Sequence, residues 1–241
     1  MPHLDSSLTR TIALAESRTV EACLDLPSGD RFNGLRPLVF MVPSSRMIDL
    51  QGNGPQIGIR DSYLLLSRSL VQAGYATYRF AWSEPGKISR REALLHYRAA
   101  RLESGVDLRK IFLLGMEDGA DLLAREYYEF YAVAPPMGHV LLSPRVHPID
   151  LNNLTCPYLV LHGQDDPQFQ VIPYRQLEGA IHHHRARYGD LTANHWFPHL
   201  KQNLGRVYLA EEVVGEIQRW LKQVIKDPSR PQEPAARGSA A

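Results

Sequence analysis

The sequence predicts a doubly wound α/β domain, in which helices cover both faces of a mostly parallel sheet. Short apolar runs, each the length of a buried strand, alternate along the chain with segments of helical spacing. In the middle of the chain, the apolar run 111–114 is followed by the turn 115–119, which has a glycine at each end, and then by a helical segment. The chain has 241 residues, enough for one large domain with a substantial core.

The amino-terminal elements are predicted to form the edge and the first buried strand of the sheet. Residues 9–15 and 19–26 both favour strands and are separated by three polar residues, which predicts an antiparallel hairpin. Residues 37–42 are continuously apolar, which is typical of a strand buried on both faces. The segment 43–59 is rich in Gly, Ser, Pro and Asn and is predicted to be a loop. The further predicted strands are residues 75–80, 138–142, 157–161 and 182–188.

The predicted helices follow the strands in alternation, as expected for a parallel sheet. Ser89 begins one of them, with Glu92 three residues later in a capping-box pattern. We expect a single domain over residues 1–226 with no inserted lid, and a disordered tail over 227–241, which is rich in Pro, Ala and polar residues. The predicted helices are residues 61–73, 89–103, the segment after Gly119, and 206–225.

Composition excludes several classes of function. The formal net charge is +1 with acidic and basic residues interspersed, so we expect neither a nucleic-acid nor a membrane partner. The two cysteines, Cys23 and Cys156, are more typical of buried thiols than of a disulfide framework. The first residues lack a signal-peptide pattern and no run is long enough to span a bilayer, so we expect a cytoplasmic protein.

Ligand sites in such sheets lie at the carboxyl ends of the parallel strands. The loops after residues 42, 80, 114, 142 and 161 are therefore expected to share one pocket. The sequence contains no dinucleotide fingerprint and no P-loop, so we expect no cofactor. We also expect no metal site, because His182, His183 and His184 would point to opposite faces of the predicted strand 182–188.

Four stretches, in this order, resemble the motifs of the α/β-hydrolase superfamily, and above all its compact, lidless members of the esterase and dienelactone-hydrolase type. The resemblance covers residues 9–225 and implies an eight-stranded, mostly parallel sheet with helices on both faces. The stretches are residues 42–52, which resemble the oxyanion loop, 107–119, the nucleophile elbow, 162–168, the turn that carries the acid, and 193–197, the loop that carries the catalytic histidine.

The resemblance implies a role for each matching residue. Glu117 stands at the nucleophile position, His195 would carry the proton, and Asp166 would orient His195, with Asp165 the nearest rival for the acid and Asp150 a weaker one. The resemblance also implies residues that would bind the negative charge and residues that would line the pocket. The backbone amides of Ser44 and Asp118 would stabilise negative charge, and the residues expected to line the pocket are Ser45, Arg46, Trp82, Met116 and Trp196.

Two positions depart from the family pattern, since Glu117 stands where the family carries serine and Arg46 where a small residue is usual. Glu117 could act as a carboxylate nucleophile, although its extra methylene, relative to the aspartate of some relatives, moves the attacking oxygen by about a bond length. It could instead exchange a proton with the substrate. A third possibility is a non-catalytic protein, in which Glu117 fills the oxyanion hole or pairs with Arg46.

The sequence thus favours an enzyme that acts on a small, largely apolar molecule. A constellation of Glu117, His195 and Asp166 replaces the serine triad, and acid/base chemistry of the lyase, isomerase, cyclase or decarboxylase type is favoured over ordinary ester hydrolysis. The alternatives are a pseudo-hydrolase that binds a ligand or a protein partner, and a hydrolase with Glu117 as nucleophile.

Overall fold

The computed structural model describes residues 7–14, 18–28, 34–54, 61–145, 147–163, 174–197 and 211–227. They form one eight-stranded sheet with the strand order β1-β2-β4-β3-β5-β6-β7-β8. The strands are β1 (Ser7–Leu14), β2 (Arg18–Asp25), β3 (Arg36–Val42), β4 (Ala76–Phe80), β5 (Val106–Met116), β6 (Gly138–Leu142), β7 (Tyr158–Gly163) and β8 (Ala193–Phe197).

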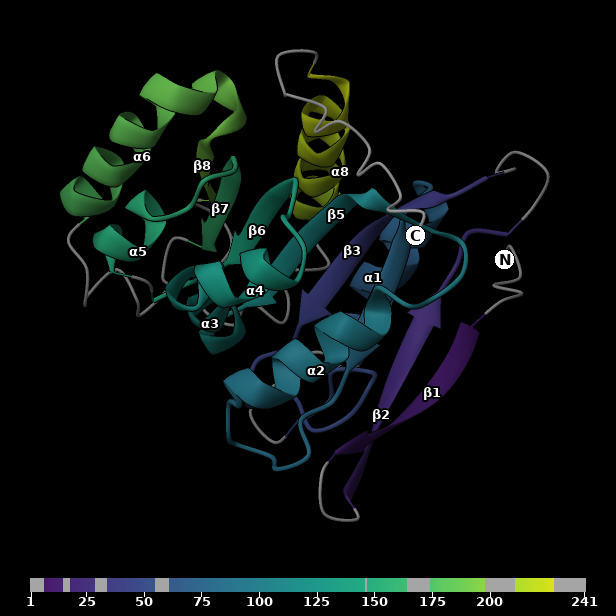
Figure 1. Cartoon of the computed structure of the whole chain (residues 1–241). Helices are drawn as coiled ribbons and strands as arrows, with labels where there is room; N and C mark the ends of the chain where they lie inside the picture. Colours follow the sequence, from purple (N-terminus) through teal and green to yellow (C-terminus); the bar gives the residue numbers. More distant parts are fainter. Residues whose placement is uncertain are drawn as a thin grey trace, which may run out of the picture.

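The sheet is parallel from β4 to β8, and an antiparallel hairpin completes one edge. β1 pairs with β2, and β2 with β4, in antiparallel register, whereas all other neighbours are parallel. The hairpin forms one side of the molecule in Figure 1. β6 and β7, at two of the predicted strand positions, are buried along their whole lengths. The predicted hairpin and the parallel sheet are both confirmed.

Helices cover both faces of this sheet (Figure 1). Side chains of β3 alternate between two cores: Leu38 and Phe40 pack in the core beneath α2, α3, α4 and α6, while Val39 and Met41 pack in the core beneath α1 and α8. The helices are α1 (Ser62–Gln72), α2 (Arg90–Ala100), α3 (Asp118–Arg125), α4 (Tyr127–Val133), α5 (Pro148–Asn152), α6 (Tyr174–Tyr188), the short 3₁₀ helix η3 (Gly189–Leu191) and α8 (Glu211–Lys226).

The start of α2 confirms half of the predicted capping box. The Ser89 hydroxyl accepts a hydrogen bond from the Glu92 amide at 3.3 Å. The Glu92 carboxylate accepts from the amide and the hydroxyl of Ser83, at 2.7 and 2.8 Å. Glu92 therefore ties α2 to the loop that follows β4.

The predicted last strand, residues 182–188, is wrong. These residues belong to α6, and the last strand is β8, at Ala193–Phe197. Leu177, Ala180, Ile181 and His184 are buried at the spacing of one helical face. The His184 ring also contacts the Thr192 hydroxyl at 2.7 Å and the Leu154 carbonyl at 2.9 Å, so this histidine belongs to the packing of α6.

The remaining predictions concern composition and the tail. Cys23 and Cys156 are buried thiols. Residues 228–241 of the predicted tail, and residues 206–210 of the predicted last helix, lie outside the described residues. No helix in the described part of the chain has the length and apolar character needed to cross a bilayer.

Candidate functional site

The site is built around the turn between β5 and α3. Glu117 occupies this turn with φ 52° and ψ −119°, a backbone conformation that is unusual for a residue other than glycine. Its amide donates to the Leu142 carbonyl at 2.7 Å, and its carbonyl accepts from the amides of Ala120 and Asp121 at 3.0 and 3.1 Å. The sharp strand–turn–helix predicted from the sequence is therefore present, with Glu117 at its apex.

Both glycines of this turn are required by close backbone contacts. A Cβ on Gly115 would lie 2.4 Å from the Cα of Ala120, at the point where α3 packs on β5. A Cβ on Gly119 would lie 2.5 Å from the Pro43 carbonyl oxygen and 2.7 Å from that of Val42. Only glycine allows α3 to approach both strands so closely.

The Glu117 carboxylate is held by the loop that follows β3. Its Oε2 accepts from the Ser44 hydroxyl at 2.7 Å and from Nε of Arg46 at 2.9 Å. The Nη2 of Arg46 forms an ion pair with Oε1. The guanidinium thus binds both carboxylate oxygens, the bidentate geometry that gives the strongest pairs of this kind. The Glu117 side chain is 14% exposed and that of Arg46 37%.

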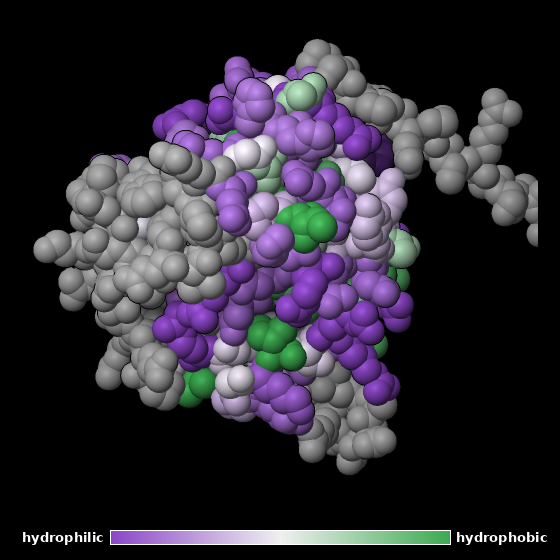
Figure 2. Space-filling view, turned by 90° about the vertical axis from the view of Figure 1, so that its left-hand side faces the viewer, coloured by the Kyte–Doolittle hydropathy of each residue, from purple (hydrophilic) through white to green (hydrophobic). Residues whose placement is uncertain are grey.

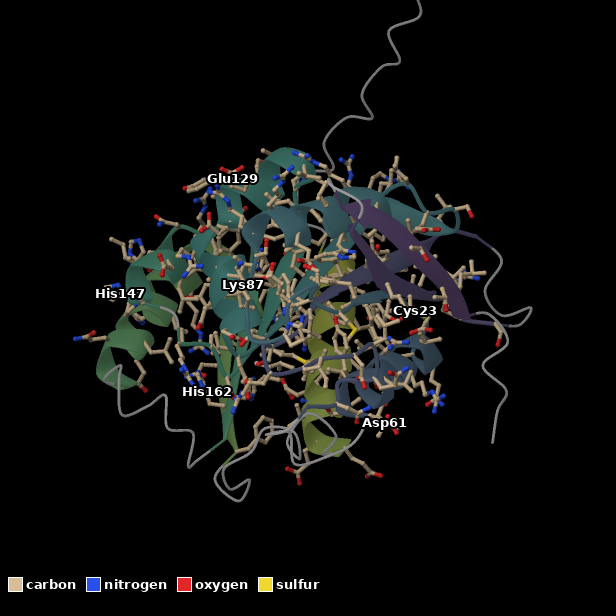
Figure 3. All side chains as sticks on the ribbon, turned by 90° about the horizontal axis from the view of Figure 1, so that it is seen from below. Cys23, Asp61, Lys87, Glu129, His147 and His162 are labelled. Atoms are coloured by element: carbon tan, nitrogen blue, oxygen red, sulfur yellow. The ribbon has the colours of Figure 1, made fainter. Side chains whose placement is uncertain are left out.

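Asp118, the next residue, binds the same loop. Its Oδ1 accepts from the Ser45 amide at 2.9 Å, and its Oδ2 accepts from the Ser45 hydroxyl. The loop after β4 also joins here, since the Gly86 amide donates to the Ser45 carbonyl at 2.9 Å. Figure 3 shows the molecule from below, from the side on which β3 ends in Figure 1. Lys87, the neighbour of Gly86 in the chain, is labelled near the middle of that view.

These contacts engage polar groups of the loop that was predicted to carry an oxyanion donor. In an acyl-transfer site the amides of the loop and of the helix start face a developing oxyanion. The predicted donors were the amides of Ser44 and Asp118. The groups that the two carboxylates bind are instead the Ser44 hydroxyl, which donates to Glu117, and the neighbouring Ser45 amide, which donates to the Asp118 side chain. Two adjacent carboxylates thus join the elbow to the predicted oxyanion loop.

A third carboxylate lies one turn along α3. Burial raises the pKa of Asp121 to about 7, and the nearby Asp118 carboxylate acts in the same direction. The Arg145 amide, which donates to Oδ1 of Asp121, opposes this shift, as do the charges of Arg145 and Arg125. Asp121 is not among the residues predicted from the sequence, although it lies one helical turn after the elbow.

Comparison with known proteins identifies the fold. No family model matches the chain, and no curated protein matches its sequence. Solved structures do match: one of two fungal esterases from Rhizomucor miehei has a TM-score of 0.66 at 14% identity, covering 92% of this chain and 83% of that chain. The chain has the α/β-hydrolase fold.

Two further α/β-hydrolase-fold structures match over the same share of this chain. A Klebsiella pneumoniae protein assigned as a dienelactone hydrolase has a TM-score of 0.62 at 17% identity, covering 92% of this chain and 100% of its own. Carboxyl esterase 2 from the mycorrhizal fungus Tuber melanosporum has a TM-score of 0.65 at 14% identity, covering 92% and 88%. The resemblance to esterases and dienelactone hydrolases is thus confirmed for the fold.

The tryptophan and methionine predicted to line the pocket lie in the core. Trp82 is 4% exposed, packs edge-on against Phe80 at a centroid distance of 5.0 Å, and donates from Nε1 to the Pro43 carbonyl at 3.2 Å. Met116 is fully buried in the core beneath α1 and α8. Trp82 therefore holds the start of the loop after β3 through its hydrogen bond to Pro43. Trp196 lies in β8, and its side chain is outside the described part of the structure.

His195 was predicted to lie in a loop, and that placement is wrong, because it lies within β8. A continuous row across the sheet pairs Met116 with Leu142, Leu142 with Leu161, and Leu161 with His195. Three strand spacings, or about 14 Å, therefore separate the backbone of His195 from that of Met116, beside Glu117.

The His195 side chain also points to another partner. Its Nε2 lies 3.2 Å from Oε1 of Glu216 on α8, and Arg219 forms an ion pair with the other oxygen of Glu216. The structure brings Glu117 together with Ser44, Ser45, Arg46 and Asp118, and places His195 with α8 instead. Residues 198–210, which follow β8 and include His199, lie outside the described residues.

The predicted acid, Asp166, and its nearest rival, Asp165, lie outside the described residues. Asp150, the weaker rival, lies in α5. Three histidines in the core, His96, His139 and His162, have their pKa lowered to about 3 by burial, so they are neutral at physiological pH. Within the described ranges, no three His, Cys, Asp or Glu side chains come together as a metal site.

Proposed function

We propose that this chain is a non-catalytic α/β-hydrolase-fold protein that binds a small molecule or a protein partner. The observation that carries the proposal is the engagement of Glu117, whose two carboxylate oxygens are both bound by the Arg46 guanidinium, with Ser44 as a third donor. A carboxylate that attacks a substrate or takes its proton must present an oxygen to the reacting atom. At this elbow, both oxygens are already engaged.

The strength of this pairing supports the proposal. Hydrogen bonds to charged groups contribute about 1.5–3 kcal/mol each, and the bidentate guanidinium–carboxylate arrangement lies at the strong end. Solvent reduces the contribution of Arg46, which is 37% exposed, but the hydroxyl of the buried Ser44 adds to it. A substrate would have to displace these donors before it met Glu117.

A second candidate is the enzyme expected from the sequence, with Glu117 as a base or a nucleophile. The observation that favours it is the backbone of Glu117, whose positive φ costs about 1–3 kcal/mol and is typical of functional sites. In this case a ligand would displace Arg46 and release the carboxylate. His195 would take no direct part, because its imidazole is held by Glu216 on α8 and its backbone lies three strands away from that of Met116.

The two candidates differ in two chromogenic assays. Nitrophenyl acetate and butyrate report nucleophilic attack, and 5-nitrobenzisoxazole reports proton abstraction by a carboxylate. We expect the natural protein and Glu117→Gln to give the same rates in both assays. We expect Arg46→Gln to release Glu117 and to raise proton abstraction about fivefold over the double variant Arg46→Gln/Glu117→Gln.

Glu129→Gln is the matched control, because this exposed residue on α4 lies outside the site and carries the same change of charge. A rate for the natural protein about tenfold or more above that of Glu117→Gln, in either assay, would overturn the proposal in favour of the enzyme. Equal rates of proton abstraction for Arg46→Gln and the double variant would instead show that pairing with Arg46 is not what prevents Glu117 from acting as a base.

A further inference from the structure

A concave site lies at the opposite end of β5 from Glu117. The cleft has a volume of about 460 Å³, within the range of small-molecule pockets. Its lining comes from the end of α2, the start of β5 and the end of α4: Arg98, Arg101, Leu102, Leu108, Ala132 and Val133. β5 resumes its regular pairing with β3 at Ile111, beyond the cleft. Six extended residues lead from Ile111 to Glu117, so the cleft and the elbow are about 20 Å apart.

The cleft carries two positive charges that its other described lining residues do not balance. Arg98 and Arg101 are three residues apart at the end of α2, so their side chains share one face of the helix. None of the described residues that line the cleft is acidic. The nearest carboxylate on β5, Asp107, pairs with Arg109 at 3.3 Å and Lys110 at 3.4 Å.

Arg101 has an unsatisfied buried donor. Its Nη1 donates to the Val133 carbonyl at the end of α4, which fixes the guanidinium at the cleft. Its Nε is buried and has no hydrogen-bond partner in the described part of the chain. Because Nε is shielded from solvent, the nitrogens of Arg101 that an anion in the open cleft would meet are the terminal ones of the guanidinium.

The rest of the lining is apolar and open to solvent. Leu102 is 88% exposed and Leu108 is 45% exposed, which is unusual for two leucines that line one cleft. Elsewhere exposed hydrophobic residues are scattered: Figure 2 shows the side where α5 and α6 lie as largely hydrophilic with isolated hydrophobic residues. The cleft thus combines an anion-binding pair with an apolar wall.

We propose that this cleft binds a small amphipathic carboxylate, that is, a carboxylic acid with an apolar body of several carbon atoms. The guanidinium groups of Arg98 and Arg101 bind the carboxylate, because the planar fork of arginine matches its two oxygens. The hydrocarbon body lies against Leu102, Leu108 and the end of α4. This inference is independent of whether Glu117 is catalytic, since the two sites are about 20 Å apart.

The test uses the full-length protein and three probes, with binding measured by isothermal titration calorimetry or by NMR. Octanoate carries both parts of the expected ligand, acetate lacks the apolar body, and 1-octanol lacks the charge. We expect octanoate to bind and the other two probes to bind at least about tenfold more weakly. We expect Arg101→Gln to weaken octanoate about tenfold, and the more exposed Arg98→Gln about threefold.

Two further variants separate binding from folding. Arg91→Gln makes the same charge change on the exposed side of the same helix, about 10 Å from Arg98, and is expected to leave octanoate affinity unchanged. Leu102→Glu places a negative charge at the mouth of the cleft, at a side chain too exposed to affect folding, and is expected to weaken octanoate. Three outcomes would each overturn the proposal. The first is equal affinity for octanoate and octanol, and the second is no octanoate binding below a Kd of about 10 mM. The third is an octanoate affinity that stays unchanged in Arg98→Gln, Arg101→Gln and Leu102→Glu.

Discussion

The chemistry of the elbow depends on which partners each carboxylate has. Glu117 and Asp118 are adjacent, and both lie at the start of α3, where unsatisfied amides and the helix dipole favour negative charge. Glu117 takes the Arg46 guanidinium and the Ser44 hydroxyl, and Asp118 takes the amide and hydroxyl of Ser45. Asp121, one turn further, is half-buried and accepts from the Arg145 amide, and burial outweighs the opposing charges of Arg145 and Arg125, so its charge is the least well compensated of the three.

This difference predicts how stability depends on pH. The pKa of Asp121 is about 7 in the folded chain and about 3.9 in an unfolded one, so between these values only the folded chain holds the proton. The free energy of unfolding therefore falls as pH rises from about 4 to about 7, by at most about 1.4 kcal/mol per pH unit. Asp121→Asn removes this dependence, because the amide stays neutral and its oxygen still accepts from Arg145.

Thermal unfolding of the two proteins at pH 4.5 and pH 8 measures the effect. We expect similar Tm values at pH 4.5 and a Tm about 5 °C higher for Asp121→Asn at pH 8. Asp190→Asn, at an exposed position in η3, is the matched control and should change neither value. A Tm for Asp121→Asn that is lower than that of the natural protein at both pH values would contradict the assigned pKa.

At the scale of elements, the sequence predicted most strands and helices because their signals were local. Short apolar runs identified β3 and the part of β5 before the elbow, and the glycines at 115 and 119 identified the turn into α3. Residues 182–188 were predicted to be a strand, but they are the end of α6, whose buried positions from Leu177 to His184 have helical spacing. That one error moved the last loop and displaced His195 from its predicted setting.

The contacts of the site could be predicted only in part, because they depend on loop geometry. The pairing of Glu117 with Arg46 was one of the predicted alternatives, because the two residues carry opposite charges on loops expected to be neighbours. The bond from Asp118 to Ser45, and the packing of Trp82 under Pro43, depend on how closely α3 approaches β3. That approach is set by the space at Gly119, which three-dimensional structure alone reveals.

The packing of α3 on the sheet is tested by two matched substitutions of glycine by alanine. Gly119→Ala places a Cβ against the backbone carbonyls of Val42 and Pro43, which cannot move without shifting β3, so we expect a loss of about 3 kcal/mol. Gly215→Ala lies inside α8 with open space around it, so we expect a gain of up to about 1 kcal/mol from helix propensity. Urea unfolding monitored by circular dichroism measures both. Equal changes in the free energy of unfolding for the two variants would show that the backbone around Gly119 can accommodate a Cβ atom.

At the scale of the whole molecule, a buried ion pair joins the antiparallel hairpin to the parallel sheet. Asp25 ends β2, and Arg79 lies in β4; both side chains are under 10% exposed. Oδ2 of Asp25 accepts from Nε of Arg79 at 2.9 Å and from the Ser67 hydroxyl of α1 at 2.6 Å. Arg79 also donates to the Leu50 carbonyl in the loop after β3. One polar network therefore connects two strands, a helix and the loop that leads back toward the elbow.

The cost of such a network appears when one partner is removed. Asp25→Leu leaves the Arg79 guanidinium buried without its counter-charge, and Arg79→Met leaves the Asp25 carboxylate in the same state, so each is expected to cost about 3–5 kcal/mol. The double variant Asp25→Leu/Arg79→Met buries no charge and is expected to be more stable than either single variant. Chemical unfolding of all four proteins gives the coupling free energy between the two sites. If the losses from the two single variants simply add in the double variant, the pair does not act as a unit, and the hairpin is held to the sheet by its backbone hydrogen bonds and apolar packing instead.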